Sequence, residues 1–151
     1  MGDREENLRT AIAKLAALGE VVTVSSFYET EPMEFGDQPW FLNCAVAMKT
    51  ALMPQRFLVR MQKIEQEMGR RRIRPKGPRT IDIDLLLFGN SVVHMPQLDV
   101  PHPALHQRRF VLEPLAEIAP EAWHPVLRRT VRELRDALPH DAGQVKRYSG
   151  R

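Results

Sequence analysis

Two aspartates, Asp82 and Asp84, stand two residues apart in the apolar run TIDIDLLL, directly after a cluster of arginines. In an extended strand, alternate side chains point to opposite faces, so both aspartates project together while the isoleucines and leucines face the core. Carboxylates placed about 7 Å apart in this way repel each other unless a cation or hydrogen-bond donors lie between them. Mg²⁺ prefers oxygen ligands and often takes one or two protein carboxylates plus substrate phosphates. The pattern predicts a magnesium site; a solvated strand face paired with arginines is the alternative.

The segment 69–79 that precedes these aspartates is strongly basic and contains no acidic residue. Its prolines and glycines predict a loop rather than a helix. The planar donors of arginine suit phosphate oxygens, and carboxylate-held metal beside arginines is the usual apparatus of phosphoryl transfer. A nucleic-acid-binding module is an alternative, but the two aspartates would repel a nucleic-acid backbone. The cations of the segment are Arg70, Arg71, Arg72, Arg74, Lys76 and Arg79.

Length and composition favour one domain spanning residues 1–151, since 43% of the 151 residues are hydrophobic and smaller units would be of marginal size. The single cysteine, Cys44, suits a reducing compartment, and we expect a buried thiol rather than a nucleophile. The N-terminus is charged and no apolar run is long enough for a bilayer, so we expect a cytoplasmic protein. The Walker and GxGxxG motifs of common nucleotide-binding folds are absent from the sequence.

Histidines offer one further candidate site. His102 and His106 have the spacing of zinc ligands on a helix. Pro103 lies between them and no third ligand is evident in the sequence, so we favour a structural or substrate-contact role.

The elements that must position these residues follow from periodicity and turn signals. A helix is expected from a cap at Asp3, with Glu6 completing a capping box, to Gly19, and another from Pro54 to Gly69, with its methionines in the core. Strands are expected over 21–28, 41–48 and 80–87, the last paired in a hairpin with 91–94. Further helices are expected within 110–120 and 130–138, the second with a capping box formed by Thr130 and Glu133, and a loosely held tail is expected from residue 139. This irregular alternation favours an α+β sandwich with helices packed on a mostly antiparallel sheet.

In the strand 41–48, Phe41 and Asn43 share the face opposite that of Leu42 and Cys44, and this second face is a candidate for ligand contact. The turn-rich segment 30–39 before it is long enough to be a functional loop.

Several motifs in register resemble the 6-hydroxymethyl-7,8-dihydropterin pyrophosphokinase family of folate biosynthesis. They are SSFYETEP, DQPWFLN, GRRR, GPRTIDIDLLLFGN, VPHP and RRFVLEPLAEIAP, and they extend from about Asp3 to Pro120. The resemblance implies a ferredoxin-like α+β sandwich. It also implies transfer of pyrophosphate from ATP and magnesium to the hydroxymethyl group of the pterin, with release of AMP.

The resemblance further implies roles for individual residues. Asp82 and Asp84 match the ligands of two magnesium ions and, with Arg70 and Arg79, the catalytic residues. Residues that match the pterin site are Thr30, Met33, Phe41, Asn43 and Phe110. Residues that match the ATP site are Gln62, Glu65, Arg70, Arg72, Arg79, Leu85, His102 and Arg108.

Members of the family ordinarily begin with an apolar strand that leads into a Gly-Ser-Asn turn, and this sequence begins inside that turn. The first strand is therefore missing from this sequence, and three explanations are open: residues ahead of Met1 are omitted, the start codon is wrongly chosen, or another chain supplies the strand. The implied partners are ATP and the pterin, without nucleic acid or membrane, and a monomer is expected. The alternative function is a homologue that binds pterin or nucleotide without catalysis because it lacks the first strand.

Overall fold

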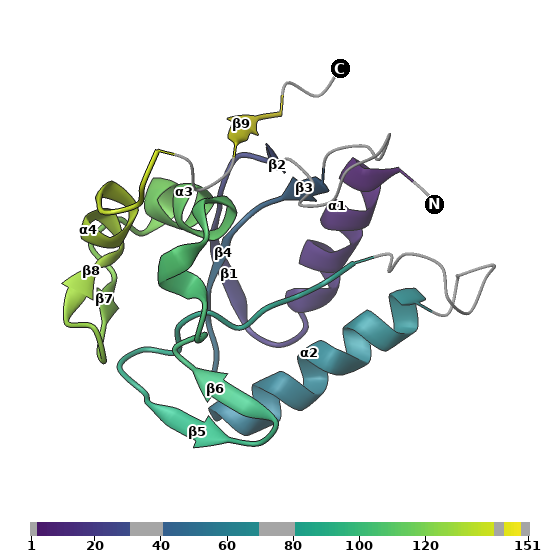
Figure 1. Cartoon of the computed structure of the whole chain (residues 1–151). Coiled ribbons are helices and arrows are strands. Elements are labelled where there is room, and N and C mark those ends of the chain that lie inside the picture. The colour runs from purple at the N-terminus through teal and green to yellow at the C-terminus, as the bar shows by residue number, and fades with distance from the viewer. Residues whose placement is uncertain (1–2, 31–40, 70–80, 141–143, 149–151) are drawn as a thin grey trace.

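The computed structural model describes residues 3–30, 41–69, 81–140 and 144–148, which contain four α-helices and nine short strands. All strand pairings among these residues are antiparallel. In Figure 1, α1 and α2 lie on one side of the β1–β4 strand pair, and α3 and α4 lie on the other. The predicted α+β class is confirmed. In these described ranges, no helix is both long and apolar enough to cross a bilayer.

Helix α1, Arg4–Leu15, begins at the predicted cap. The carboxylate of Asp3 accepts hydrogen bonds from the backbone N–H groups of Glu5 (2.9 Å) and Glu6 (3.3 Å). These bonds satisfy donors that have no partner within the helix. The buried residues of the helix are Leu8, Ala11 and Leu15, and the helix ends at Leu15, before the predicted Gly19.

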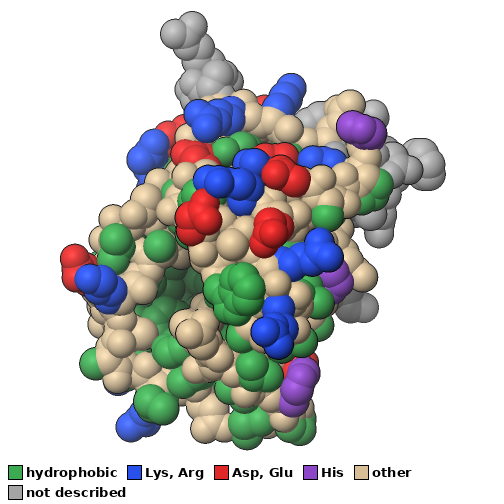
Figure 2. All heavy atoms as spheres, turned by 90° about the vertical axis from the view of Figure 1, so that its left-hand side faces the viewer, with side chains coloured by type: hydrophobic (Ala, Val, Ile, Leu, Met, Phe, Trp, Pro, Cys, Tyr) green, Lys and Arg blue, Asp and Glu red, His purple; other side chains and the backbone are tan. Residues whose placement is uncertain are grey.

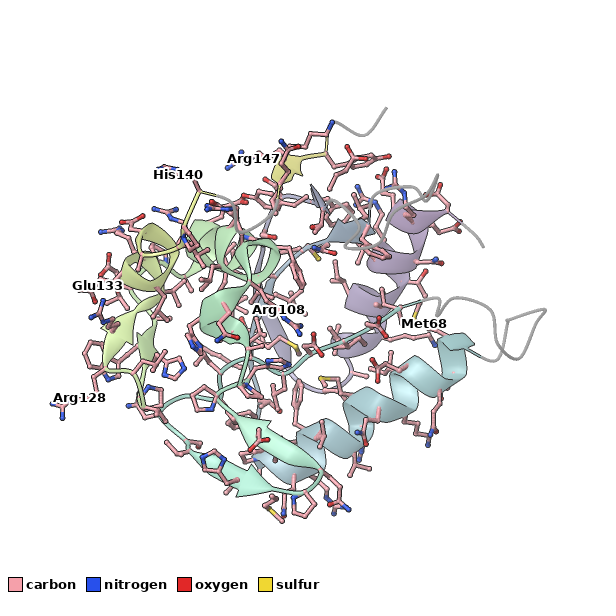
Figure 3. The ribbon with its side chains drawn as sticks, in the orientation of Figure 1. Met68, Arg108, Arg128, Glu133, His140 and Arg147 are labelled. Atoms are coloured by element: carbon pink, nitrogen blue, oxygen red, sulfur yellow. The ribbon has the colours of Figure 1, made fainter. Side chains whose placement is uncertain are left out.

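Helix α2, Pro54–Gly69, begins at the predicted proline and ends at the predicted glycine. Its apolar face packs against α1, and the two methionines on that face, Met61 and Met68, are core residues as expected. Figure 3 places Met68 at the C-terminal end of the helix. Each large apolar side chain buried here stabilises the fold by about 1.5–3 kcal/mol. We call the following cluster the helical core: Ala11, Leu15, Leu18, Phe57, Met61, Ile64 and Met68.

The strands predicted over 21–28 and 41–48 are each interrupted. Strand β1, Glu20–Val24, pairs with β4, Val46–Lys49, and β2, Tyr28–Thr30, pairs with β3, Phe41–Asn43. The interruption falls at Ser25, which is buried.

The hydroxyl of Ser25 accepts a hydrogen bond from the backbone N–H of Ala45 (2.8 Å) and donates one to the carbonyl of Ser26 (2.7 Å). The Ser25 N–H also donates to the carbonyl of Ala45 (2.9 Å). A serine side chain that binds nearby backbone groups competes with the regular strand ladder, which explains why each expected strand is divided in two.

The predicted tail contains a further strand. Strand β9, Val145–Arg147, pairs with the edge of β2, and Tyr148 N–H donates to the carbonyl of Phe27 (2.8 Å). The expectation of a loosely held segment is therefore wrong for residues 145–148. The alternation of Val145 with the polar side chains around it was too short to predict a strand.

The segment 81–88 carries the two aspartates, and its geometry differs in part from the prediction. None of these residues has a strand assignment, so the predicted strand 80–87 is wrong over the part that the structure describes. The predicted alternation nevertheless holds from 81 to 85. Asp82 and Asp84 are exposed, whereas Ile81, Ile83 and Leu85 pack against the helical core.

The predicted hairpin between 80–87 and 91–94 is also wrong. Gly89 makes the expected turn with φ of 55°, a value that favours glycine. The chain then enters β5, Val93–Met95, which pairs with β6, Leu98–Val100, instead of with the aspartate segment. The aspartate segment is linked to the region after β6 by the N–H of His102, which donates to the carbonyl of Leu86 (2.9 Å).

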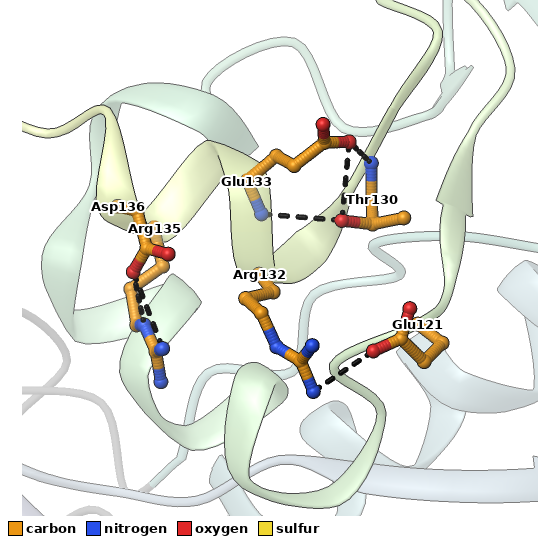
Figure 4. Close-up of polar contacts among 6 residues, drawn as sticks. All are labelled: Glu121, Thr130, Arg132, Glu133, Arg135 and Asp136. Atoms are coloured by element: carbon orange, nitrogen blue, oxygen red, sulfur yellow. Dashed lines mark hydrogen bonds and ion pairs between the residues drawn. The ribbon is translucent and has the colours of Figure 1, made fainter.

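The predicted C-terminal helices are confirmed as α3, Arg109–Ile118, and α4, Val131–Asp136. The predicted capping box is also present: Thr130 and Glu133 exchange side-chain and backbone hydrogen bonds at the start of α4 (Figure 4). Between the helices, β7, Trp123–His124, pairs with β8, Arg129–Thr130. We call the apolar cluster between these elements the α3–α4 core: Ala45, Leu105, Leu112, Leu115, Ala116, Val131 and Leu134.

Candidate functional site

The aspartate segment is held between α2 and the solvent. On the α2 side, the carboxylate of Glu65 accepts a hydrogen bond from the backbone N–H of Ile83 (2.6 Å), the residue between the two aspartates. On the outer side, Asp82 and Asp84 present their carboxylates to solvent. Packing of the neighbouring isoleucines and this short bond together fix the direction in which both aspartates point.

The donor set of this segment suits a particular kind of metal binding. Among the described residues, no group of three or more His, Cys, Asp or Glu side chains could hold a metal ion. Asp82 and Asp84 alone cannot supply all the ligands of a metal ion. They fit the coordination typical of Mg²⁺, in which one or two carboxylates share the ion with water and substrate phosphates.

Three of the residues predicted for pterin binding lie together on the β2–β3 pair. Thr30 stands opposite Phe41 in the register, and Tyr28 stands opposite Asn43, so one face of the pair carries all four side chains. The amide nitrogen of Asn43 donates to the hydroxyl of Thr30 (2.6 Å), which orients the Asn43 amide. Phe41 is 54% exposed, so its ring is available for stacking.

Two further predicted residues lie at the start of α3. Arg108 precedes the first turn of the helix, and its guanidinium lies over the ring of Phe110 at 5.6 Å from the ring centroid. Figure 3 shows Arg108 at this end of α3. Phe110 is half-buried. The pairing of Phe41 and Phe110 around one ligand ring stays a prediction.

The remaining residues predicted for ATP binding come from separate elements. Gln62 is exposed on α2, one turn before Glu65. The side chain of Leu85 packs against the helical core, so a contact with nucleotide would come from its backbone. Four other predicted residues, Met33, Arg70, Arg72 and Arg79, lie outside the described residues.

Within the part of the chain that the structure describes, His102 and His106 belong to no group of three or more possible metal ligands. The Nδ1 atom of His102 accepts the N–H of Ala104 (3.2 Å), and His106 lies in the short 3-10 helix Leu105–Gln107. His124 is buried and its Nδ1 accepts the N–H of Leu127 (3.0 Å). Burial, and secondarily the proximity of His106, lower the pKa of His124, which favours its neutral form. The structural or substrate-contact role that was favoured for His102 and His106 from the sequence stays a prediction, as does the contact of His102 with ATP.

A polar junction that the sequence did not predict joins α3 to β2 and β9. Its centre is Glu117, near the C-terminal end of α3. The Glu117 carboxylate accepts hydrogen bonds from the N–H of Ser26 (3.0 Å), the hydroxyl of Ser26 (2.9 Å) and the hydroxyl of Tyr28 (2.6 Å). Arg147 lies 3.8 Å from the same carboxylate.

Charge and burial around this junction shift two pKa values in opposite directions. Burial raises the pKa of Glu117, but hydrogen bonds from Tyr28 and Ser26 outweigh it and leave the pKa below its usual range. Burial and the bond to Glu117 raise the pKa of Tyr28. The junction therefore holds an ionised carboxylate against a neutral phenol at neutral pH.

Two grooves flank this junction. One, of about 640 Å³, lies between α1 and the β1–β2 connection, and the other, of about 530 Å³, lies along β9 and α3. Figure 2 shows acidic and basic side chains gathered on the upper part of the face that it presents, above a hollow with apolar side chains. The first groove includes Arg9 and Phe27, and the second includes Tyr28, Glu117 and Arg147. Neither groove is lined by the exposed aspartates.

Comparison with known proteins agrees with the resemblance noted from the motifs. The family model for 7,8-dihydro-6-hydroxymethylpterin-pyrophosphokinase matches residues 1–120. The chain is 51% identical over 120 residues to the 2-amino-4-hydroxy-6-hydroxymethyldihydropteridine pyrophosphokinase of Bacillus subtilis, a match that covers 78% of this chain and 72% of that protein. It is 40% identical over 135 residues to the protein of the same name from Aquifex aeolicus, covering 89% and 84% of the two chains.

A longer relative matches almost the whole chain. The folic acid synthesis protein fol1 of Schizosaccharomyces pombe is 41% identical over 151 residues, which is 99% of this chain and 20% of that protein. The chain thus spans about a fifth of the length of this relative.

The fold and the site define an α+β domain that presents a pair of exposed carboxylates and, on a separate strand pair, an aromatic ring beside an oriented amide. With the matches above, the chain belongs to the 7,8-dihydro-6-hydroxymethylpterin-pyrophosphokinase family.

Proposed function

We propose that this chain transfers a pyrophosphoryl group from ATP to 6-hydroxymethyl-7,8-dihydropterin in folate biosynthesis. In this reaction the hydroxyl oxygen of the pterin forms a bond to the β-phosphorus of ATP, and the bond from that phosphorus to the oxygen bridging to the α-phosphate breaks. The products are AMP and the pterin pyrophosphate, and the hydroxyl proton passes to solvent. The observation that carries the proposal is membership of the family, combined with the exposed aspartate pair in its GPRTIDIDLLLFGN motif.

Asp82 and Asp84 are proposed to hold two Mg²⁺ ions together with the phosphates of ATP. Bound there, the metal would neutralise charge on the phosphates and favour ionisation of the attacking hydroxyl. The two carboxylates would supply the fixed position that this chemistry needs, because packing of Ile81 and Ile83 restricts the backbone that carries them.

The β2–β3 face is proposed to bind the pterin. Asn43, oriented by Thr30, would read the amide edge of the ring by hydrogen bonds, and Phe41 and Phe110 would stack on its two faces. The segment around Met33 would close this pocket.

The nucleotide is proposed to bind beside the aspartates. Arg70, Arg72 and Arg79 would pair with phosphate oxygens, with Arg70 and Arg79 acting on the group in transfer. The rest of the ATP site is assigned to Gln62, Glu65, Leu85, His102 and Arg108. The active unit is proposed to be a monomer.

Product identity tests the proposal. The protein is incubated with ATP, Mg²⁺ and 6-hydroxymethyl-7,8-dihydropterin, and nucleotides are separated by chromatography. We expect AMP that appears only when the pterin is present. ADP as the product would overturn the proposal, and pterin binding by calorimetry without AMP release would instead support the binding-only alternative.

A further inference from the structure

The polar junction around Glu117 connects two elements that carry residues of the proposed pterin site. Helix α3 begins near Phe110, and β2 ends at Thr30, which faces Phe41 and orients Asn43. Glu117 reaches from the helix to the beginning of β2 and to the Ser26 backbone before it. It is therefore placed to set how the helix and the strand pair lie relative to each other.

The contacts of Glu117 are of a kind that fixes position. One carboxylate oxygen accepts from the Tyr28 hydroxyl at 2.6 Å, and the other accepts from both the N–H and the hydroxyl of Ser26 at 3.0 and 2.9 Å. Tyr28 is only 6% exposed, so its ring cannot move without disturbing the packing around it. Hydrogen bonds to an ionised acceptor are shorter and stronger than neutral ones, which restricts both partners.

A second glutamate on the same helix provides the contrast. Glu113 lies one turn earlier and pairs with Arg109 at 3.3 Å, a contact made within α3. Its side chain is 31% exposed, close to the 25% of Glu117. The two residues share type, helix and exposure, but only Glu117 is bonded to the polar groups of the β1–β2 connection and β2.

We propose that Glu117 is a positioning residue for the pterin pocket, acting through Tyr28 and Ser26 to hold β2 at a fixed separation from α3. This inference rests on the proposed function. Phe110 and Glu117 lie seven positions apart on α3, a rise of about 10 Å. Pro114 removes one backbone hydrogen bond between them, but Leu112 and Pro114 are fully buried, so packing holds this part of the helix in place and a bond at Glu117 restrains the ring of Phe110. Loss of the bond would let Phe110 and the Thr30–Asn43 pair drift apart while the aspartate segment, held by Glu65 and the helical core, keeps its place.

The test compares Glu117→Ala with Glu113→Ala in the intact chain, using steady-state kinetics for both substrates and calorimetry with the pterin. We expect the KM for pterin of Glu117→Ala to rise about tenfold, the scale of losing hydrogen bonds to a charged group. Its KM for ATP should change less than about twofold. Glu113→Ala should match the wild type in both constants. Glu117→Gln keeps one accepting oxygen and should restore part of the pterin affinity.

A purely structural role predicts a different result. It would lower the thermal midpoint and the fraction of active protein, and thus kcat, while leaving the KM for pterin unchanged. That pattern, or an equal rise for Glu113→Ala, would overturn the inference. If Glu117→Ala does not fold, Tyr28→Phe removes one bond with little change of shape, and it should raise the KM for pterin by several-fold; an unchanged KM would overturn the inference. Failure of the wild type to release AMP with pterin would instead overturn the proposed function.

Discussion

The aspartate segment, residues 81–88, and the strand pair β2–β3 both carry proposed site residues, but different interactions hold them. In the aspartate segment, Ile81, Ile83 and Leu85 pack against the helical core, and one short bond to Glu65 fixes the backbone. In the strand pair, β2 is held by antiparallel pairing with β3 on one side and with β9 on the other, and also by the polar junction at Glu117. Apolar packing thus sets the direction of the two carboxylates, whereas hydrogen bonds set the positions of the residues that are proposed to bind the pterin.

The difference has a consequence for how each region responds to substitution. A carboxylate that projects to solvent contributes little to packing, so it can be removed without loss of the fold. A buried polar bond contributes to both stability and geometry, because its loss leaves a partner without a hydrogen bond. Substitution of the two aspartates should therefore separate activity from stability, whereas substitution of a residue that makes a buried or positioning hydrogen bond, in either region, should change both.

The largest effect is expected for Asp82→Asn or Asp84→Asn. Each removes a proposed metal ligand, so pterin-dependent AMP release should fall by about a thousandfold or more, since metal stabilisation of charge is worth several kcal/mol. The thermal midpoint should change little, because both side chains are exposed. Asp99→Asn, at an exposed aspartate of β6, is the control and should keep wild-type turnover. Turnover retained by both site variants would contradict the metal role.

A smaller effect is expected for Glu65→Ala, which removes the acceptor of the Ile83 N–H. The free energy of unfolding should fall by about 1.5–3 kcal/mol, as for a hydrogen bond to a charged group, and kcat should fall about tenfold or more as the aspartates lose their fixed direction. Urea denaturation and AMP release measure the two changes. Glu67→Ala is the control, since Glu67 makes an exposed ion pair with Lys14 at 3.5 Å. Equal losses in both variants would show that the bond to Ile83 has no special role.

In the strand region, Ser25→Ala should lower the free energy of unfolding by about 1–3 kcal/mol, because the buried N–H of Ala45 loses its acceptor. The KM for pterin should rise with it, since the interruption at Ser25 sets where β2 begins. Ser91→Ala is the control, because the backbone N–H of Ser91 donates to the carbonyl of Phe88 and this bond does not involve the removed hydroxyl. An unchanged free energy of unfolding in Ser25→Ala would contradict the prediction that this buried hydrogen bond stabilises the strand region.

The smallest effect concerns pH. The folded-state pKa of Glu117 lies below its ordinary value, so its bonds stabilise the fold fully above the unfolded pKa of about 4.3 and are lost as the pH falls through the lower folded value. The difference in unfolding free energy between wild type and Glu117→Gln should be constant from neutral pH to about pH 5 and shrink below about pH 4. Urea titrations across this range measure it, and a difference that persists unchanged at pH 3 would contradict the assignment.

The sequence predicted some of these features because their causes are local. The alternation from Ile81 to Leu85 depends on side-chain polarity at successive positions, and the cap at Thr130 depends on two residues three apart. The faces of Phe41 and Asn43 follow from strand periodicity in the same way. The bounds of α2 could likewise be predicted from single residues, because proline favours the first turn of a helix and glycine favours its end, as at Pro54 and Gly69.

Other features depend on partners that are distant in the chain. Tyr28 and Glu117 are 89 positions apart, and nothing near Glu117 distinguishes it from a solvated helix glutamate such as Glu113. The pairing of β9 with β2 likewise joins residues 145–147 to residues 28–30, which are far apart in the sequence. In the aspartate segment, the alternating sequence predicts which side chains face the core and which face solvent. It cannot predict that the segment forms no backbone pairing, because pairing also requires a neighbouring strand.

The most direct measurement of the central claim is pterin-dependent AMP release, followed side by side for the wild type and Asp82→Asn, with pterin binding measured for both by calorimetry. We expect AMP from the wild type, none above background from the variant, and the same pterin affinity in both. ADP as the product, or equal AMP release by the two proteins, would contradict it.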